Sequence, residues 1–153
     1  MPLFDVRSPS EFANGHAPGA ISLPLFSDDE RAEVGTVYKQ KSPAKAVRLG
    51  LKYAGLRMAD LVAEVDARVK RDATPVEVYC WRGGQRSGSV AWLLGTAGYD
   101  VHRWEGGYKA YRGRVLESWA AERPYIVLAG LTGSGKTEVL RAMLELGGPV
   151  LDL

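Results

Sequence analysis

Short apolar runs alternate with amphipathic segments along this chain. Four runs have the length and content of buried strands, at residues 3–6, 20–23, 75–79 and 101–104. The clearest helical pattern covers residues 58–70, where apolar positions recur on one face and charged positions on the other. Strands that alternate with helices predict an α/β fold, with a parallel sheet covered by helices on both faces.

Capping signals place further helices between these strands. Ser8 is a typical N-cap, Pro9 suits the first helical position, and Glu11 completes a capping box. The helix is expected to be brief, because Asn14 and Gly15 stop it. Other helices are expected from the acidic start at residues 28–31, from near Ser87, and over residues 108–121.

The single cysteine lies in a glycine-rich loop between a predicted strand and a predicted helix. Backbone N–H groups of such a loop converge on anions at a helix N-terminus, and a thiol beside that terminus and an arginine ionises more easily. A buried structural cysteine is disfavoured, since polar residues and glycines follow it. We therefore predict a nucleophilic thiolate at Cys80, in an anion-binding loop made of Trp81, Arg82, Gly83, Gly84, Gln85 and Arg86.

A second glycine-rich loop lies near the end of the chain. Residues 125–129 read as an apolar strand, residues 130–137 match the P-loop pattern, and residues 139–144 continue as a helical face. The expected phosphate-binding residues are Gly130, Gly133, Ser134, Gly135, Lys136 and Thr137, with Mg²⁺ on the Thr137 hydroxyl. The chain stops at residue 153, in what reads as the next strand. We therefore expect one domain over 1–121, and over 122–153 the first strand, loop and helix of an incomplete P-loop domain.

Composition narrows the class of protein. The 153 residues are 46% apolar and 25% charged, as in ordinary globular proteins. One cysteine excludes an internal disulfide, and two histidines argue against structural zinc, which fits a reducing cytoplasmic setting. There is no apolar run long enough to cross a bilayer. The net charge of +2 is small, but residues 34–59 hold six basic residues and no acidic one, a run that could meet phosphates.

Three segments resemble known families. Residues 5–12 and 15–21 are similar to the N-terminal signature of rhodanese domains, and residues 80–86 resemble their active-site loop. A rhodanese-like domain followed by a P-loop resembles the tRNA 2-selenouridine synthases, and the amino-acid sequences of residues 24–40, 80–87 and 130–137 support that resemblance. On this reading the chain is a truncated member of the family, and we expect it to lack full activity.

The cysteine loop departs from that of sulfur-transferring rhodaneses. In the loop typical of those proteins an arginine lies five positions after the cysteine, whereas here Arg86 lies six positions after Cys80. The longer loop is similar to those of rhodanese-like phosphatases and arsenate reductases. Such a loop should leave a wider cradle that admits a tetrahedral oxyanion, which favours a phosphate-bearing donor such as selenophosphate over thiosulfate.

The resemblance implies a transferase that replaces the sulfur of wobble 2-thiouridine in tRNA by selenium. Selenophosphate and geranyl diphosphate would be substrates, an S-geranylated tRNA the intermediate, and no cofactor would be tightly bound. Cys80 would act in the selenium step, through a selenium-bearing adduct, with Arg86 and the loop N–H groups stabilising the anion. Implied partners are tRNA and the selenophosphate-producing enzyme, with no membrane. Our candidate tRNA contacts are Lys39, Lys41, Lys45, Arg48, Arg103, Lys109, Arg112 and Arg114.

Other readings stay open at this point. The chain could be a thiosulfate sulfurtransferase or a rhodanese-like cysteine phosphatase. It could also be a non-catalytic module that docks tRNA or a protein, with Cys80 idle. His16 is expected to hold a turn by hydrogen bonding rather than to act as a base. Residues 104–108 could either form a wall of the site or simply pack.

Overall fold

The computed structural model describes residues 1–70, 74–122 and 126–150. The chain divides into two compact units, Met1–Trp119 and Ala120–Leu153, which are treated separately below. The sequence-based boundary lies close by, between residues 121 and 122. No helix among the described residues is both long and apolar enough to span a membrane.

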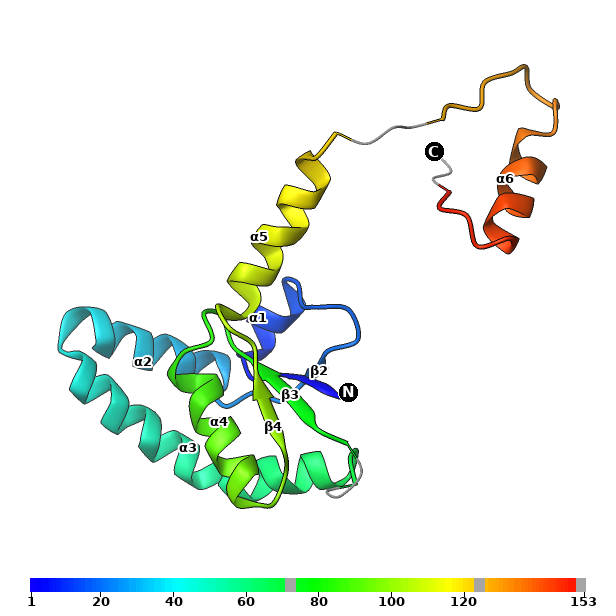
Figure 1. Ribbon diagram of the computed structural model, residues 1–153. Coiled ribbons are helices and arrows are strands. Elements are labelled where there is room, and N and C mark those ends of the chain that lie inside the picture. Colours follow the sequence, from blue (N-terminus) through cyan, green and yellow to red (C-terminus); the bar gives the residue numbers. More distant parts are fainter. Residues whose placement is uncertain (71–73, 123–125, 151–153) are drawn as a thin grey trace. The chain divides into compact units, whose positions relative to one another are not determined.

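The first unit is built on a four-stranded parallel sheet, as predicted (Figure 1). Its strands are β1 (Leu3–Asp5), β2 (Ile21–Ser22), β3 (Val76–Tyr79) and β4 (Val101–Arg103), in the order β2-β1-β3-β4. Each begins and ends within the apolar run that predicted it. Because β1 and β3 are central, the loop after β3 emerges in the middle of the sheet's carboxyl edge, where ligands bind in parallel α/β sheets.

Five helices accompany this sheet: α1 (Pro9–Ala13), α2 (Asp28–Gln40), α3 (Pro43–Asp66), α4 (Gln85–Thr96) and α5 (Gly107–Ala120). Side chains alternate across the strands, so they build two clusters. Phe4 and Val78 pack in one cluster with Val65 of α3 and Val90 of α4. Leu3 and Tyr79 pack in the other, with Tyr108 and Tyr111 of α5. The predicted arrangement of helices on both faces is thereby confirmed.

A buried ion pair joins the N-terminal segments to α5. The guanidinium of Arg7 lies 2.6 Å from the carboxylate of Asp5, and both side chains are almost wholly buried. Arg7 also donates to the carbonyl of Gly15 and lies 4.0 Å from the centre of the Tyr108 ring. Burying a charge is costly unless it is paired, and here these partners satisfy it. The pair gives a structural reason for the Asp-x-Arg pattern at residues 5–7.

The helix predicted over residues 58–70 is the end of a longer one. In the structure α3 begins at Pro43 and ends at Asp66, where Ala67 is the C-cap. Ser42 accepts a hydrogen bond from the N–H of Lys45, and Pro43 occupies the first turn, the same start signal as Ser8 and Pro9. Helices α2 and α3 pack side by side as a hairpin (Figure 1).

In the second unit the structure confirms the helix but not the strand. The helix is α6 (Lys136–Glu145), directly after the glycine-rich loop. The strand predicted over 125–129 is absent from residues 126–129, and residue 125 lies outside the described part. Ile126 and Val127 are 98% and 83% exposed. A strand needs a neighbour to pair with, and the described residues of this unit provide none. Val150 is not in a strand, and residues 151–153 are outside the described part.

Candidate functional site

The cysteine loop is fixed by close backbone contact with the segment before α5. Gly83 has a φ of 65°, and a Cβ there would lie 2.6 Å from the carbonyl oxygen of Trp104. A Cβ at Gly107 would lie 2.2 Å from the carbonyl oxygen of Cys80. Only glycine fits at these positions. The N–H groups of Tyr108 and Lys109 donate to the carbonyls of Cys80 and Trp81, at 3.0 and 2.9 Å.

Residues 104–108 pack against the cysteine loop and do not form a wall of the cavity. They support the cysteine loop from behind and are not among the residues that line the cavity in front of it. The support leaves the loop little freedom, because its backbone is held by hydrogen bonds on one side and by steric contact on the other. A rigid loop of this kind keeps its N–H groups oriented before any ligand arrives.

The Cys80 thiol is buried, and its pKa lies below the ordinary value. Burial raises that pKa, but it is outweighed by hydrogen bonds from the hydroxyl and N–H of Ser87 and the N–H of Arg82, and by the charge of Arg86. The Ser87 Oγ lies 3.3 Å from the Cys80 Sγ and 3.2 Å from the carbonyl oxygen of Gly84. The arrangement therefore favours the thiolate, which is the nucleophilic form.

Arg86 is held by a carboxylate that we did not predict as part of the site. Its two terminal nitrogens donate to Glu11, at 2.5 and 3.2 Å. Burial raises the pKa of Glu11, but the hydrogen bond and charge of Arg86, the N–H of Ser8 and the charge of Arg31 together lower it. Glu11 thus has two roles, since it also completes the capping box of α1.

Arg31 of α2 is the other unpredicted residue near the loop. Its Nε lies 3.6 Å from Glu11, and this buried nitrogen has no hydrogen-bond partner among the described residues.

The sequence held a signal for Glu11, because a Glu at the third helical position was recognised as a cap. It held a signal for Ser87 as well, in the first turn after the loop. Nothing in the sequence marks Arg31, which is brought to the site by tertiary folding.

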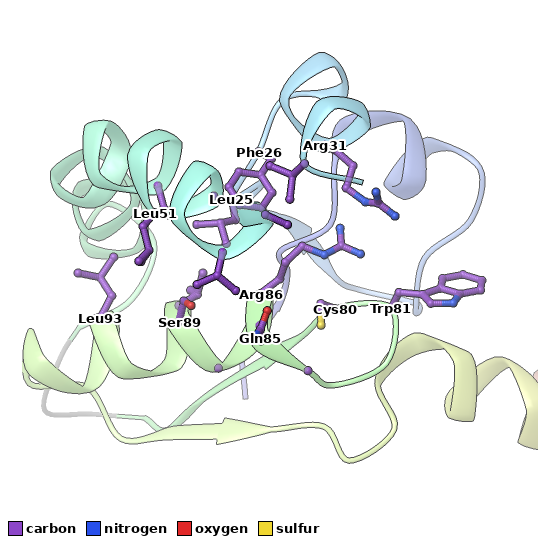
Figure 2. A pocket seen from close by; sticks show the side chains of 18 of the residues that line it. Leu25, Phe26, Arg31, Leu51, Cys80, Trp81, Gln85, Arg86, Ser89 and Leu93 are labelled. Atoms are coloured by element: carbon purple, nitrogen blue, oxygen red, sulfur yellow. The ribbon is translucent and has the colours of Figure 1, made fainter. Parts of the chain in front are cut away.

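A cavity of about 1180 Å³ opens in front of the loop, between α2, α3 and α4 (Figure 2). Of the predicted loop residues, Cys80, Trp81, Arg82, Gly84, Gln85 and Arg86 line it, whereas Gly83 packs against the supporting segment. Apolar residues from the three helices form much of the remaining wall. The volume lies somewhat above the usual range of about 300–1,000 Å³ for ligand-binding clefts.

The predicted tRNA contacts fall into two exposed groups. Lys39, Lys41, Lys45 and Arg48 lie where α2 meets α3, and Arg103, Lys109, Arg112 and Arg114 lie on β4 and α5. All eight side chains are exposed.

His16 lies apart from the cysteine, with its ring stacked on Phe12 and its Nδ1 3.0 Å from the Phe12 carbonyl oxygen. Its predicted role in holding the turn is confirmed.

Two glycines in the loop of the second unit have left-handed backbone conformations. Gly133 and Gly135 have φ values of 80° and 79°, which other residues rarely adopt. The ammonium of Lys136 donates to the carbonyls of Gly130 and Leu131, both at 2.7 Å. Thr137 is exposed in the first turn of α6. It could give Mg²⁺ one oxygen, but the described residues contain no cluster of three acidic, histidine or cysteine side chains to complete a metal site.

Comparisons with known proteins agree with the fold of the first unit. The rhodanese-like domain family matches residues 1–114. The crystal structure of the N-terminal domain of a proposed ATP/GTP binding protein from Clostridium difficile 630 superimposes on this chain with a TM-score of 0.67. The two sequences are 39% identical. That match covers 74% of this chain and 88% of the other.

Curated relatives extend the match beyond the first unit. The tRNA 2-selenouridine synthase of Cupriavidus necator is 49% identical over 142 residues, which is 90% of this chain and 38% of that protein. The tRNA 2-selenouridine synthase of Azotobacter vinelandii is 41% identical over 157 residues, 100% of this chain and 41% of that protein. The chain thus spans about two fifths of these relatives. It belongs to the rhodanese-like domain family, and both of these curated relatives, matched along 90% or more of this chain, are tRNA 2-selenouridine synthases.

Proposed function

We propose that this chain supplies the thiolate centre of a tRNA 2-selenouridine synthase, in which Cys80 acts in the step that delivers selenium to the wobble uridine. The observation that supports this most directly is the Cys80 Sγ, which the hydroxyl of Ser87 and the charge of Arg86 favour as a thiolate beside an open cavity. The names of the relatives support tRNA as the substrate and 2-selenouridine as the product, and the proposal adds 2-thiouridine as the nucleoside that is converted.

The donor in this proposal is selenophosphate, and the length of the loop bears on how it reacts. A cradle for a tetrahedral oxyanion favours attack by the thiolate on phosphorus, in which the S–P bond forms, the P–Se bond breaks and selenium leaves as hydrogen selenide. Attack on selenium would instead form an S–Se bond and expel phosphorus as phosphite, two oxidation levels lower, so that phosphate could be released only with an added oxidant. We therefore propose a phosphocysteine in place of the selenium-bearing adduct that the family resemblance implied.

The remaining steps then balance without a redox partner. Hydrogen selenide adds to C2 of the S-geranylated 2-thiouridine, the C–Se bond forms and geranylthiol leaves with the proton. Water cleaves the phosphocysteine, which releases phosphate and restores the thiolate. The loop N–H groups stabilise the phosphoryl oxygens in both phosphoryl steps. Arg86, held by Glu11, contributes positive charge at the edge of the loop.

The proposal is tested in the full-length protein with the variant Cys80→Ser, which keeps the shape of the side chain but removes the thiolate. We expect tRNA from cells carrying this variant to contain S-geranylated 2-thiouridine and no 2-selenouridine, as read by nucleoside mass spectrometry. Formation of 2-selenouridine at the wild-type level would overturn the role of Cys80. Intact-mass and phosphorus NMR measurements on trapped enzyme distinguish phosphocysteine from a selenium adduct.

In the same proposal the glycine-rich loop of the second unit binds the diphosphate of geranyl diphosphate. Its support is the backbone conformation at Gly133 and Gly135 together with the positive charge of Lys136. In the full-length protein, Lys136→Ala should weaken geranyl diphosphate binding by about tenfold or more, since one charge-assisted contact to phosphate is lost. Unchanged binding would contradict this role.

The loop geometry also favours one rival, a rhodanese-like cysteine phosphatase. Its chemistry would use the same thiolate and the same cradle, but without a selenium acceptor. Hydrolysis of a generic aryl phosphate by this chain, abolished in Cys80→Ser, would support the rival. A cyanide-linked thiosulfate assay tests the sulfurtransferase reading in parallel. A chain inactive in both assays, with a Cys80 that alkylates no faster than an ordinary thiol, would be a binding module.

A further inference from the structure

The cavity beside Cys80 has more apolar wall than the transfer of a small selenium group requires. Its lining includes Val34 of α2, Leu51 of α3 and Leu93 of α4, together with Leu25 and Phe26 from the segment before α2. Figure 2 shows Leu51 and Leu93 at one end, Phe26 and Leu25 between, and Cys80 and Trp81 at the other end. The cavity is therefore an elongated groove that leads away from the thiol.

Several large apolar side chains of this groove are exposed to solvent. Leu51 is 62% exposed, Trp92 65% and Tyr38 58%. These three residues come from α3, α4 and α2, so the exposure is not confined to one element. Contiguous apolar surface of this kind marks a binding site for an apolar group.

The helices also keep the groove open with glycine. Gly50 and Gly55 of α3 line it, although glycine is unfavourable in the interior of a helix. A Cβ at Gly50 would approach the Phe26 ring to 3.3 Å, whereas a Cβ at Gly55 would meet nothing within 4 Å. At Gly55 the neighbouring structure does not require glycine, and the missing side chain leaves space in the groove.

Charge indicates which end of a ligand lies at the thiol. Arg31, Arg82 and Arg86 line the groove at the loop, and its other charged lining residues are Lys39 and Arg103. None of the described residues that line it is acidic. The groove therefore complements an amphiphile, with an anionic head beside the arginines and an apolar tail between the helices. A polypeptide fits less well, because its backbone polar groups would find few partners along the apolar wall.

We infer that this groove binds the hydrocarbon chain of the substrate, so that the geranyl group of an S-geranylated 2-thiouridine lies between α2, α3 and α4 while its C2 faces the Cys80 loop. The inference rests on the proposed function and adds a subsite for the leaving group. It explains why the tail would be recognised in the same unit that holds the thiolate. Binding the tail there would orient the C–S bond toward the incoming selenium.

The test compares two ligands that differ only in the tail, S-geranyl-2-thiouridine 5′-monophosphate and its S-methyl counterpart. Isothermal titration to the 153-residue chain should show the geranyl ligand binding at least about tenfold more tightly, because each buried methylene adds affinity. Leu51→Asp places a charge in the groove and should remove most of that preference. The matched control is Leu56→Asp, on the same helix at a position 80% exposed and outside the groove, which should keep it.

Equal affinity for the two ligands, or a preference that survives Leu51→Asp, would overturn the inference. Sedimentation of the free chain covers the other occupant, since self-association abolished by Leu51→Asp would make the groove a contact between copies. Both measurements use binding alone, without selenium donor or turnover. If Cys80→Ser still formed 2-selenouridine, the proposed reaction would be wrong. The preference for the geranyl ligand over the S-methyl ligand would still be decided by the binding measurements.

Discussion

At the scale of single residues, the proton of the Ser87 hydroxyl links the loop to the state of the thiol. The hydroxyl oxygen lies within hydrogen-bond distance of both the Cys80 Sγ and the Gly84 carbonyl oxygen. One proton cannot serve both acceptors fully. When Cys80 is a thiolate the stronger acceptor is the sulfur, so the hydroxyl stabilises the charged form more than the neutral form.

Replacing Ser87 by alanine should therefore raise the pKa of Cys80, because the thiolate loses a hydrogen bond that the neutral thiol needs less. The thiol would then be mostly protonated at a pH where the native protein is already reactive. The measurement is the pH dependence of iodoacetamide alkylation. Ser89→Ala serves as the control, because Ser89 lies on the same helix but is exposed. Equal profiles for Ser87→Ala and the native chain would show that the hydroxyl does not favour the thiolate.

The pair of Glu11 and Arg86 predicts a pH dependence of stability. The pKa of Glu11 is lower in the folded chain than its ordinary value of about 4.3, so the unfolded chain binds more protons near that pH. The stabilisation is complete above about pH 4.3 and is lost as the pH falls through the folded pKa. Glu11→Gln removes the charge but can keep the capping interaction with Ser8.

We expect Glu11→Gln to lower the free energy of unfolding by about 2 kcal/mol at pH 7, and by much less near pH 3. Urea denaturation at several pH values measures both. Glu117→Gln on α5 is the control, since that carboxylate is exposed. A loss that is the same at both pH values would mean that the ion pair is not the source of the effect.

At the scale of elements, the cysteine loop depends on how closely α5 begins beside it. Gly107→Ala places a Cβ against the Cys80 carbonyl, and its φ of 57° adds backbone strain. Gly98→Ala has strain alone, because φ is 95° and nothing lies within 4 Å. We expect about 1–2 kcal/mol of destabilisation for Gly98→Ala and at least about 3 kcal/mol for Gly107→Ala in urea unfolding. Comparable losses would show that the loop yields easily to the contact.

The elements also show what the sequence could and could not predict. The strands and the cysteine loop were predicted because each is a local pattern, an apolar run or a glycine-rich turn. The first half of α3 was missed, since Gly50 and Gly55 interrupt its apolar periodicity and the basic run over residues 34–59 was interpreted only as a surface that could meet phosphates. The strand at residues 126–129 was overpredicted, because an apolar run forms a strand only with a partner. Arg31 and the apolar groove arise from tertiary packing alone.

At the scale of the whole molecule, the two exposed basic groups predict how tRNA binding responds to salt. Each neutralised phosphate contact adds about 0.7–0.9 to the slope of log affinity against log salt. Replacing Lys39, Lys41, Lys45 and Arg48 by glutamine removes four charges from the junction of α2 and α3. If all four contact phosphates, the slope should fall by about 3, and replacing Arg103, Lys109, Arg112 and Arg114 should have a similar effect.

The control must separate local contacts from net charge, because each fourfold replacement changes the net charge from +2 to −2. A third variant replaces four other exposed basic residues, namely Lys52, Arg68, Lys70 and Arg141. It has the same net charge, so a nonspecific field would affect tRNA binding equally in all three variants. Filter binding to tRNA between 50 and 200 mM salt gives the slopes. If a variant has the same slope as the third variant, the group that it replaces does not contact tRNA. If its slope falls further than that of the third variant, the replaced group contacts the tRNA backbone.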